Sequence, residues 1–182
     1  MKIIGLAGWS GAGKTTLVAR LIPYWAERGV RVSTVKHAHH KFDIDVPGKD
    51  SWVHRQAGAH EVLVYSDRRW VLMHELRNEP APNLAELLGK MAAVDLVVIE
   101  GFKSAPYPKI EVHRAANGKP WLFPDDDWIM GLAADAAVDT RLPVTHLDDV
   151  PRIAAMMEAL ASPLEDLDAA AIGQLQVENS PA

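Results

Sequence analysis

The sequence has no cysteine, no long apolar run and no excess of basic residues, and each absence narrows what the protein can be. Without cysteine, the chain can build neither a disulfide scaffold nor a zinc site made of thiolates. No stretch approaches the roughly 18 apolar residues that span a membrane. The first ten residues also lack the apolar region of a signal peptide. We therefore expect a cytoplasmic protein with no membrane partner.

The charge balance is acidic, with 19 Lys and Arg against 24 Asp and Glu and a formal net charge of -5. A general nucleic-acid binder needs a basic surface to neutralise phosphates, so we expect no nucleic-acid partner. Hydrophobic residues make up 48% and charged residues 24%, which is ordinary for a globular protein that buries a full core. A chain of 182 residues favours one compact domain.

The first part of the chain alternates strand, helix and strand. Residues 2–7 (KIIGLA) form an apolar run without alternation, which is typical of a strand buried on both faces of a parallel sheet. An apolar stripe predicts a helix over residues 14–28, with a bend at Pro23 because proline removes one backbone bond. Residues 30–35 read as a second strand. Together these elements predict a right-handed βαβ unit.

Between the predicted strand and helix, residues 8–15 (GWSGAGKT) match the phosphate-loop pattern G-x-x-x-x-G-K-[ST]. Glycines let phosphate oxygens approach the backbone, whose N–H groups then face the anion. Lys14 is expected near the β- and γ-phosphates, and the Thr15 hydroxyl is expected to bind Mg²⁺. The residues predicted to contact the nucleotide are Gly11, Ala12, Gly13, Lys14, Thr15 and Thr16.

Later elements complete an α/β pattern. We expect a short helix over 51–57 begun by Asp50, an antiparallel hairpin from runs 61–66 and 70–76, and a helix that Asn83 opens with a capping box to Glu86. The remaining elements are predicted strands at 96–99, 110–113 and 128–132, and a last helix begun by Asp148 or Asp149. The predicted fold is a three-layer P-loop NTPase domain over residues 1–161, with a mostly parallel sheet, one hairpin and a loosely held tail over 162–182.

Glu100 is the candidate second acid of the phosphate site. It ends the apolar strand LVVIE, where a carboxylate can reach the Mg²⁺ shell or polarise water. Asp95 begins the same strand and is better explained as a cap. We therefore assign Lys14 and Glu100 as candidate catalytic groups, and Thr15 and Glu100 as candidate metal ligands.

A histidine-rich segment, KHAHHKFDID, follows the second strand. Its three histidines, His37, His39 and His40, together with two aspartates suit zinc or magnesium, although their spacing matches no defined zinc motif. A solvated loop is the plain alternative. We favour a switch-like loop in which Asp43 or Asp45 approaches Mg²⁺, and Asp45 is the assigned ligand. Lys103 and Lys109 are equally well explained as solvated lysines or as contacts to an anion.

The base of the nucleotide is not decided by these residues. The sequence has no N-K-x-D motif. Asp135 follows a strand and can either accept hydrogen bonds from a guanine edge or cap a turn. There is no obvious catalytic glutamine, and Arg114 or a partner's arginine is a candidate arginine finger. GTP and ATP both remain open at this point.

The combined motifs closely resemble the molybdopterin-guanine dinucleotide biosynthesis adaptor protein (protein B) family. The resemblance runs through GLAGWSGAGKTTL, VKHAHHKFDIDVPGKDSWVHRQAGA, VVIEGFK and PKIEV, over residues 1–160. It implies a dimeric protein that binds Mg²⁺ and GTP, hydrolyses GTP weakly, and works with molybdopterin guanylyltransferase, with molybdopterin as a further candidate ligand. Carried over by position, the nucleotide site comprises Gly11, Gly13, Lys14, Thr15 and Glu100, with Asp135 as a looser match for the base pocket. A second block matches at Asp45, Gly48, Lys49, Asp50 and Ser51.

Two other functions remain alternatives. A small-molecule kinase using ATP would line an acceptor pocket with the histidine-rich segment. A metallochaperone GTPase would use His37, His39 and His40 as ligands for nickel or zinc. The hairpin around residues 67–69 is a candidate homodimer contact, because an edge strand tends to recruit a partner strand.

Overall fold

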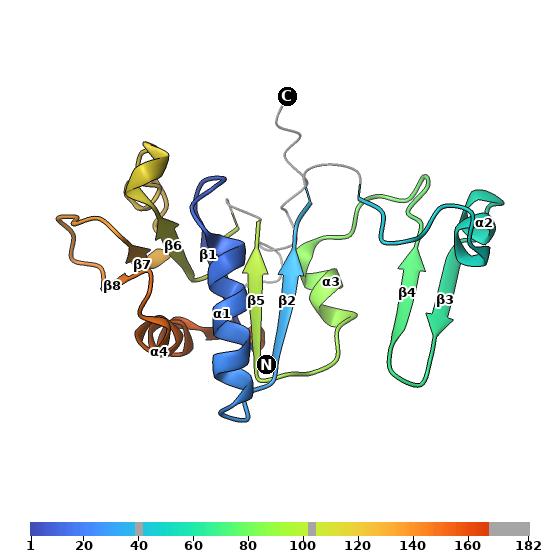
Figure 1. The fold of residues 1–182 in the computed structure, drawn as a ribbon, viewed down its shortest axis with the longest axis horizontal. Helices are drawn as coiled ribbons and strands as arrows, with labels where there is room; N and C mark the ends of the chain where they lie inside the picture. Colours follow the sequence, from blue (N-terminus) through green and yellow to red (C-terminus); the bar gives the residue numbers. More distant parts are fainter. Residues whose placement is uncertain (39–41, 102–104, 168–182) are drawn as a thin grey trace. The chain divides into compact units, whose positions relative to one another are not determined.

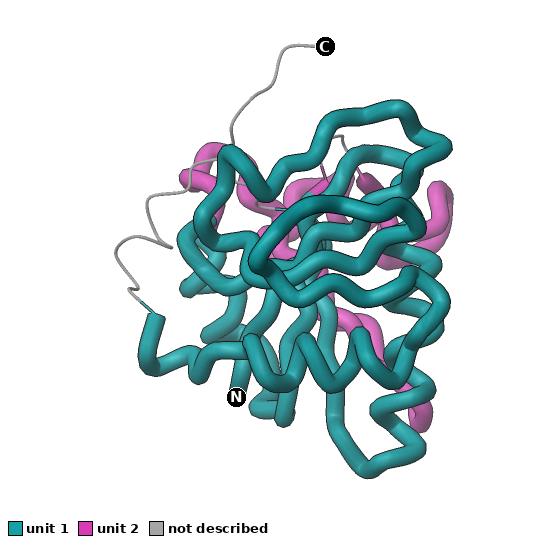
Figure 2. Tube along the Cα trace, turned by 90° about the vertical axis from the view of Figure 1, so that its left-hand side faces the viewer, with its two compact units in different colours: residues 1–37, 83–182 teal, residues 38–82 magenta. Residues whose placement is uncertain are grey.

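The computed structural model describes residues 1–38, 42–101 and 105–167. The chain clusters into two compact units, and a domain over residues 1–161 stays a prediction. The main unit comprises residues 1–37 and those from 83 onward, and the insert comprises residues 38–82. Figure 2 colours the main unit teal and the insert magenta. Within the described ranges, no helix is long and apolar enough to cross a bilayer.

The main unit is built on a sheet with six parallel strands (Figure 1). From one edge to the other these are β2 (Val32–Lys36), β5 (Leu96–Glu100), β1 (Lys2–Ala7), β6 (Lys109–His113), β7 (Ile129–Ala134) and β8 (Val144–His146). The short β9 (Ser162–Pro163) pairs antiparallel with the start of β1. Because parallel strands end at the same sheet edge, the residues that follow β1, β5, β6 and β7 meet there.

Helices cover both faces of this sheet. On one face α1 (Lys14–Ala26) and α4 (Val150–Leu160) share a core with Ile4 and Leu6 of β1. On the other face α3 (Leu84–Gly89) packs with Ile3. Neighbouring residues of β1 therefore point into different cores, as expected for a strand buried on both faces. The predicted α/β fold with a mostly parallel sheet is confirmed.

The element boundaries follow local chemistry, with one difference from expectation at the start of α2. Asn83 forms the predicted capping box, because its side chain accepts from Glu86 N at 2.9 Å and Glu86 Oε2 accepts from Asn83 N at 2.8 Å. α1 continues through Pro23, and Glu27 N donates to the carbonyl of Pro23 at 3.0 Å. The helix α2 (Asp50–Gln56) has Lys49 as its N-cap, so Asp50 is the first helical residue rather than the cap.

The insert contains α2 and the predicted antiparallel hairpin, formed by β3 (Glu61–Tyr65) and β4 (Trp70–His74). The register pairs Leu63 with Leu72 and Tyr65 with Trp70. Tyr65 is 80% exposed and Trp70 is 70% exposed. One face of the hairpin is therefore an exposed apolar surface.

The residues after α4 are better held than expected. β9 pairs with β1, and Leu164 N donates to the carbonyl of Met1 at 3.0 Å. Leu164 and Leu167 also pack against the core on the α3 face. The expected loose tail therefore does not apply to residues 162–167, and the rest of it lies outside the described residues.

Candidate functional site

The loop at residues 8–15 joins β1 to α1 with the backbone that its glycines allow. Gly8, Gly11 and Gly13 have φ values of 139°, 80° and 96°, in the region that favours glycine. Lys14 Nζ donates to the carbonyls of Gly8 at 2.6 Å and Trp9 at 3.0 Å. The loop therefore curls around the lysine, and the first turn of α1 follows directly. A helix N-terminus with a cation beside it favours an anion.

Glu100 and Thr15, predicted as metal ligands from distant parts of the chain, lie together. Leu6 pairs with Glu100 in the sheet, which places the end of β5 beside the loop that follows β1. Thr15 Oγ1 donates to Glu100 Oε1 at 3.4 Å, and Lys36 Nζ lies 3.8 Å from the same oxygen. The Glu100 side chain is 18% exposed. A hydroxyl and a carboxylate are oxygen ligands of the kind that Mg²⁺ takes.

Asp135 follows β7 and holds the neighbouring turn. Its Oδ1 accepts from Ala115 N at 2.7 Å, at the start of the 3-10 helix η1 (Ala115–Asn117). Its Oδ2 lies 3.6 Å from Arg114 Nη1. The structure thus shows the capping role that we considered for Asp135. Contact with a guanine remains a prediction.

Residues after β6 lie beside the loop at residues 8–15. We did not predict this contact from the sequence. A Cβ on Gly13 would lie 3.3 Å from Arg114 Nη2, so the guanidinium stands next to the loop backbone. Asn117 Nδ2 donates to the carbonyl of Ser10 at 3.2 Å, and Trp9 Nε1 donates to that of Pro120 at 2.8 Å. Arg114 was considered only as a candidate arginine finger. Its place immediately after a predicted strand was the local signal for a position at this edge.

Polar side chains buried in β6 pair with the segment that follows the strand. Glu111 is fully buried and accepts from the backbone N–H groups of Leu122 and Phe123, while burial raises the pKa of its carboxyl. Lys109 is 1% exposed, and its Nζ lies 2.6 Å from Asp126 Oδ2. Burial lowers the pKa of Lys109, against the opposing effect of Asp126. Lys109 is therefore not a solvated lysine, and Lys103 lies outside the described residues.

Asp45, the third predicted metal ligand, lies in the insert. Its side chain accepts from Ser51 Oγ at 2.8 Å and from Arg55 Nη1 at 3.2 Å. Burial favours a higher pKa for Asp45, but the hydrogen bonds from Ser51, Arg55 and the Val46 N–H lower it. Arg55 also binds Asp43 and Glu75. Asp45 therefore organises the insert through this ionic network, and its role as a Mg²⁺ ligand remains a prediction.

The histidine-rich segment begins at the sheet edge, where His37 N donates to the carbonyl of Glu100 at 2.8 Å. A Cβ on Gly101 would lie 2.6 Å from His37 Cβ, so the two backbones are in close contact. His39 and His40 lie outside the described residues.

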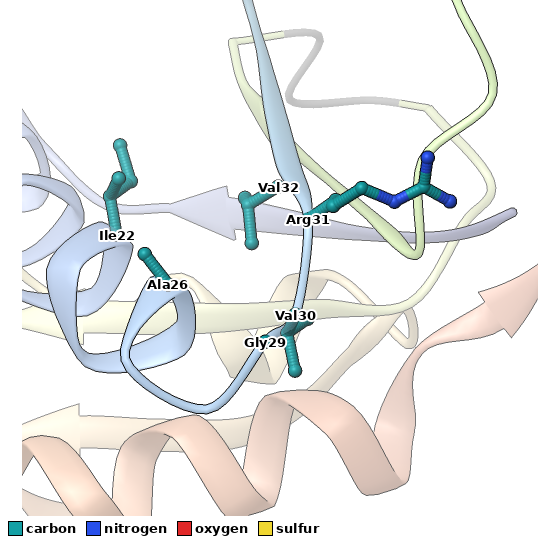
Figure 3. A pocket seen from close by; sticks show the side chains of 6 residues that line it. All are labelled: Ile22, Ala26, Gly29, Val30, Arg31 and Val32. Carbon is teal, nitrogen blue, oxygen red and sulfur yellow. The ribbon is translucent and has the colours of Figure 1, made fainter.

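Figure 3 draws the side chains that line an open pocket, whose volume is about 380 Å³. It is lined by Ile22, Ala26, Gly29, Val30, Arg31 and Val32, which lie at the end of α1 and the start of β2. Because α1 begins at the glycine-rich loop and the pocket lies at its other end, the pocket is not part of the candidate site.

Known proteins resemble this chain over most of its length. The family profile described as molybdopterin guanine dinucleotide synthesis protein B matches residues 3–135. A molybdopterin-guanine dinucleotide biosynthesis adapter protein from Haemophilus influenzae is 37% identical over 160 residues, covering 86% of this chain and 87% of the relative. The protein of the same name from Escherichia coli is 37% identical over 155 residues, covering 84% and 89%.

Solved structures of similar proteins have the same fold as this chain. The crystal structure of a molybdopterin-guanine biosynthesis protein B superposes with a TM-score of 0.69 at 29% identity, covering 87% of this chain and 99% of that one. Bacillus subtilis MobB gives a TM-score of 0.68 at 23% identity, covering 89% and 99%, and supports the fold alone.

Proposed function

The chain belongs to the molybdopterin guanine dinucleotide synthesis protein B family and is an adapter of that biosynthesis, and we propose that it serves there as a GTP-binding accessory protein. In this role it binds Mg²⁺ with GTP, hydrolyses the nucleotide slowly and assists molybdopterin guanylyltransferase. Molybdopterin is a further candidate ligand. Cytoplasmic location is part of the proposal.

One observation carries the nucleotide proposal: the approach of Thr15 to Glu100 beside the lysine-centred loop. The glycine-rich backbone and Lys14 suit the phosphates, whereas Thr15 and Glu100 would hold the Mg²⁺ that accompanies a bound nucleotide. When bound, the ion would neutralise developing charge on the phosphates. Lys36 Nζ lies 3.8 Å from Glu100 Oε1 and places a cation beside that carboxylate.

The side chains around the candidate site favour slow hydrolysis of GTP. Arg114 places a cation next to Gly13, but it is also paired with Asp135. Within the described part of the site, no glutamine is positioned to orient an attacking water, and an unoriented water reacts slowly. A rate above about 1 s⁻¹ without a partner would place the protein among true phosphoryl-transfer enzymes and contradict the accessory role.

Calorimetric titration of GTP, GDP and ATP into the purified protein with Mg²⁺ tests the proposal. Preference for GTP over ATP supports the accessory role and justifies adding the guanylyltransferase next. Preference for ATP would overturn it in favour of a small-molecule kinase.

Glu100→Gln should weaken the Mg²⁺-dependent part of GTP binding by about tenfold or more. The amide keeps the size of the side chain but removes its charge, and a contact to a charged group is worth about 1.5–3 kcal/mol. The measurement is GTP titration with Mg²⁺ and with EDTA. Asp95→Asn is the matched control, because Asp95 immediately precedes the other end of β5 and binds Arg31. An equal loss in both buffers would show that Glu100 does not act through the metal.

We also propose that the protein forms a homodimer, with the hairpin of the insert as the contact between the two chains. Leu63, Tyr65, Trp70 and Leu72 share one exposed face of the hairpin. Exposed apolar surface of this kind marks interaction sites. Light scattering at micromolar concentration is expected to give the mass of two chains, and Trp70→Ser to shift the protein toward monomer. Val53→Ser, an exposed apolar residue of α2, is the control. A wild-type monomer would contradict the proposal.

A further inference from the structure

Two histidines and a glutamate gather in the insert, at the end of the hairpin away from its turn. His60, His74 and Glu79 each offer one ligand atom, and these atoms all lie within 4.8 Å of one another. His60 Nε2 lies 3.4 Å from Glu79 Oε1, and His74 Nε2 lies 3.3 Å from Glu79 Oε2. The two imidazole rings meet edge to face at 4.7 Å. The nucleotide site does not use any of these side chains.

The backbone of the hairpin brings these residues together. His74 ends β4 and pairs directly with Glu61, the first residue of β3, which places His60 beside them. Glu75 N donates to the carbonyl of His60 at 3.1 Å, which extends the hydrogen bonding between β3 and β4 by one bond. Glu79 follows in a turn closed by its own N–H to the carbonyl of Leu76. Three ligand positions are thus fixed by strand register and one turn.

The separations suit a tetrahedral metal ion. Zinc binds imidazole nitrogen and carboxylate oxygen at about 2.0–2.2 Å, so two ligand atoms of a tetrahedral site lie about 3.3–3.5 Å apart. Each imidazole has one such separation to a different carboxylate oxygen of Glu79, from His60 Nε2 to Oε1 and from His74 Nε2 to Oε2, and one ligand atom from each of the three residues lies within 4.8 Å of the others. Imidazole ligands favour zinc and similar transition ions over magnesium, which prefers an all-oxygen shell.

Glu61 supplies the outer partner that a metal-binding histidine usually has. Its Oε1 lies 2.8 Å from His74 Nδ1, on the far side of the ring from Glu79. A carboxylate on one ring nitrogen fixes the tautomer and leaves the other nitrogen free to bind a metal. His60 and Glu79 are both about half exposed, so an ion can reach the cluster from solvent.

We propose that His60, His74 and Glu79 bind one divalent transition ion of the zinc class, with Glu61 orienting His74. Three protein ligands leave one position for water or for a ligand from a partner. The bound ion links the start of β3, the end of β4 and the turn that follows, and so stabilises the insert. This site is separate in sequence and in chemistry from the Mg²⁺ site proposed at Thr15 and Glu100.

The test uses the tag-free full chain, stripped with EDTA and titrated with Zn²⁺ and with Co²⁺ in excess Mg²⁺. We expect one equivalent of tight binding, visible absorption from Co²⁺ in a low-symmetry nitrogen and oxygen site, and a higher melting temperature with Zn²⁺. His74→Ala and His60→Ala should each abolish all three signals. Glu61→Gln should weaken binding by about 10- to 100-fold, as expected for loss of an outer partner.

Two controls separate this cluster from other histidines. His54→Ala removes an exposed histidine of α2 in the same unit and should leave binding unchanged. The triple change of His37, His39 and His40 to alanine tests the histidine-rich segment and should also leave binding unchanged. Circular dichroism checks that each variant folds; if His74→Ala does not, the more exposed His60→Ala decides the result.

Three outcomes would overturn the proposal. Absence of Zn²⁺ binding by the wild-type protein in excess Mg²⁺ would identify the cluster as a hydrogen-bonded group only. Binding that survives His60→Ala would place the ion elsewhere. Binding lost in the triple variant but kept in His60→Ala would assign it to the histidine-rich segment.

Discussion

Lys14→Ala is expected to lower nucleotide affinity about 100-fold or more while leaving the protein folded. Losing one partner of a close charged contact costs about 2–5 kcal/mol, and each 1.4 kcal/mol is tenfold in affinity. In the structure, Lys14 Nζ donates to the carbonyls of Gly8 and Trp9 within the loop itself. Its charge is therefore held at the place where phosphates are proposed to bind.

Calorimetry with GTP and thermal melting followed by circular dichroism measure the two halves of this prediction. Lys2→Ala is the matched control, because Lys2 is an exposed lysine at the opposite end of β1. The control should bind GTP like the wild type. Unchanged GTP affinity in Lys14→Ala would remove the loop from the nucleotide site, and an unfolded variant would show that the lysine serves the fold.

Gly8→Ala is expected to damage both the loop and the sheet edge. An added Cβ would lie 2.4 Å from the carbonyl oxygen of Val112 in β6. This oxygen is a backbone atom, so it cannot rotate away as a side chain could. The φ of 139° is also a region that side chains rarely adopt, and holding a residue in such a region costs about 1–3 kcal/mol. We expect a loss of stability of that size, together with weaker nucleotide binding because the loop must shift.

Urea denaturation and GTP titration measure these effects. Gly89→Ala is the matched control: Gly89 ends α3, a Cβ there meets nothing within 4 Å, and its φ is not positive. Because alanine restricts the unfolded chain more than glycine does, the control should be neutral or stabilising by up to about 1 kcal/mol. Equal effects at Gly8 and Gly89 would contradict the close approach of the loop to β6.

Local patterns determined much of the fold. The apolar runs of β1 and β5, the period of α1, the hairpin and the capping box at Asn83 could all be predicted, because each depends on residues close in sequence. The strands β8 and β9 were missed, since three and two residues are too short to show a pattern. The folding of residues 162–167 onto β1 was missed for a related reason: the partner of β9 lies at the other end of the chain.

Within the candidate site, the glycine-rich loop and Glu100 were read from the sequence, because a motif and a charged residue after an apolar strand are both local signals. The sequence could not show that Arg114 and Asn117 stand beside the loop, that Asp135 caps η1, or that Lys109 is buried against Asp126. Each of these depends on which strands become neighbours.

The sequence by itself therefore determined most of the elements, the loop at residues 8–15 and the family to which its motifs point. Only the tertiary structure decided that β1 lies between β5 and β6, and that His60, His74 and Glu79 share one corner of the insert. The physical reason is that periodicity and turn chemistry act over a few residues, whereas strand order and register depend on burying surfaces far apart in the chain.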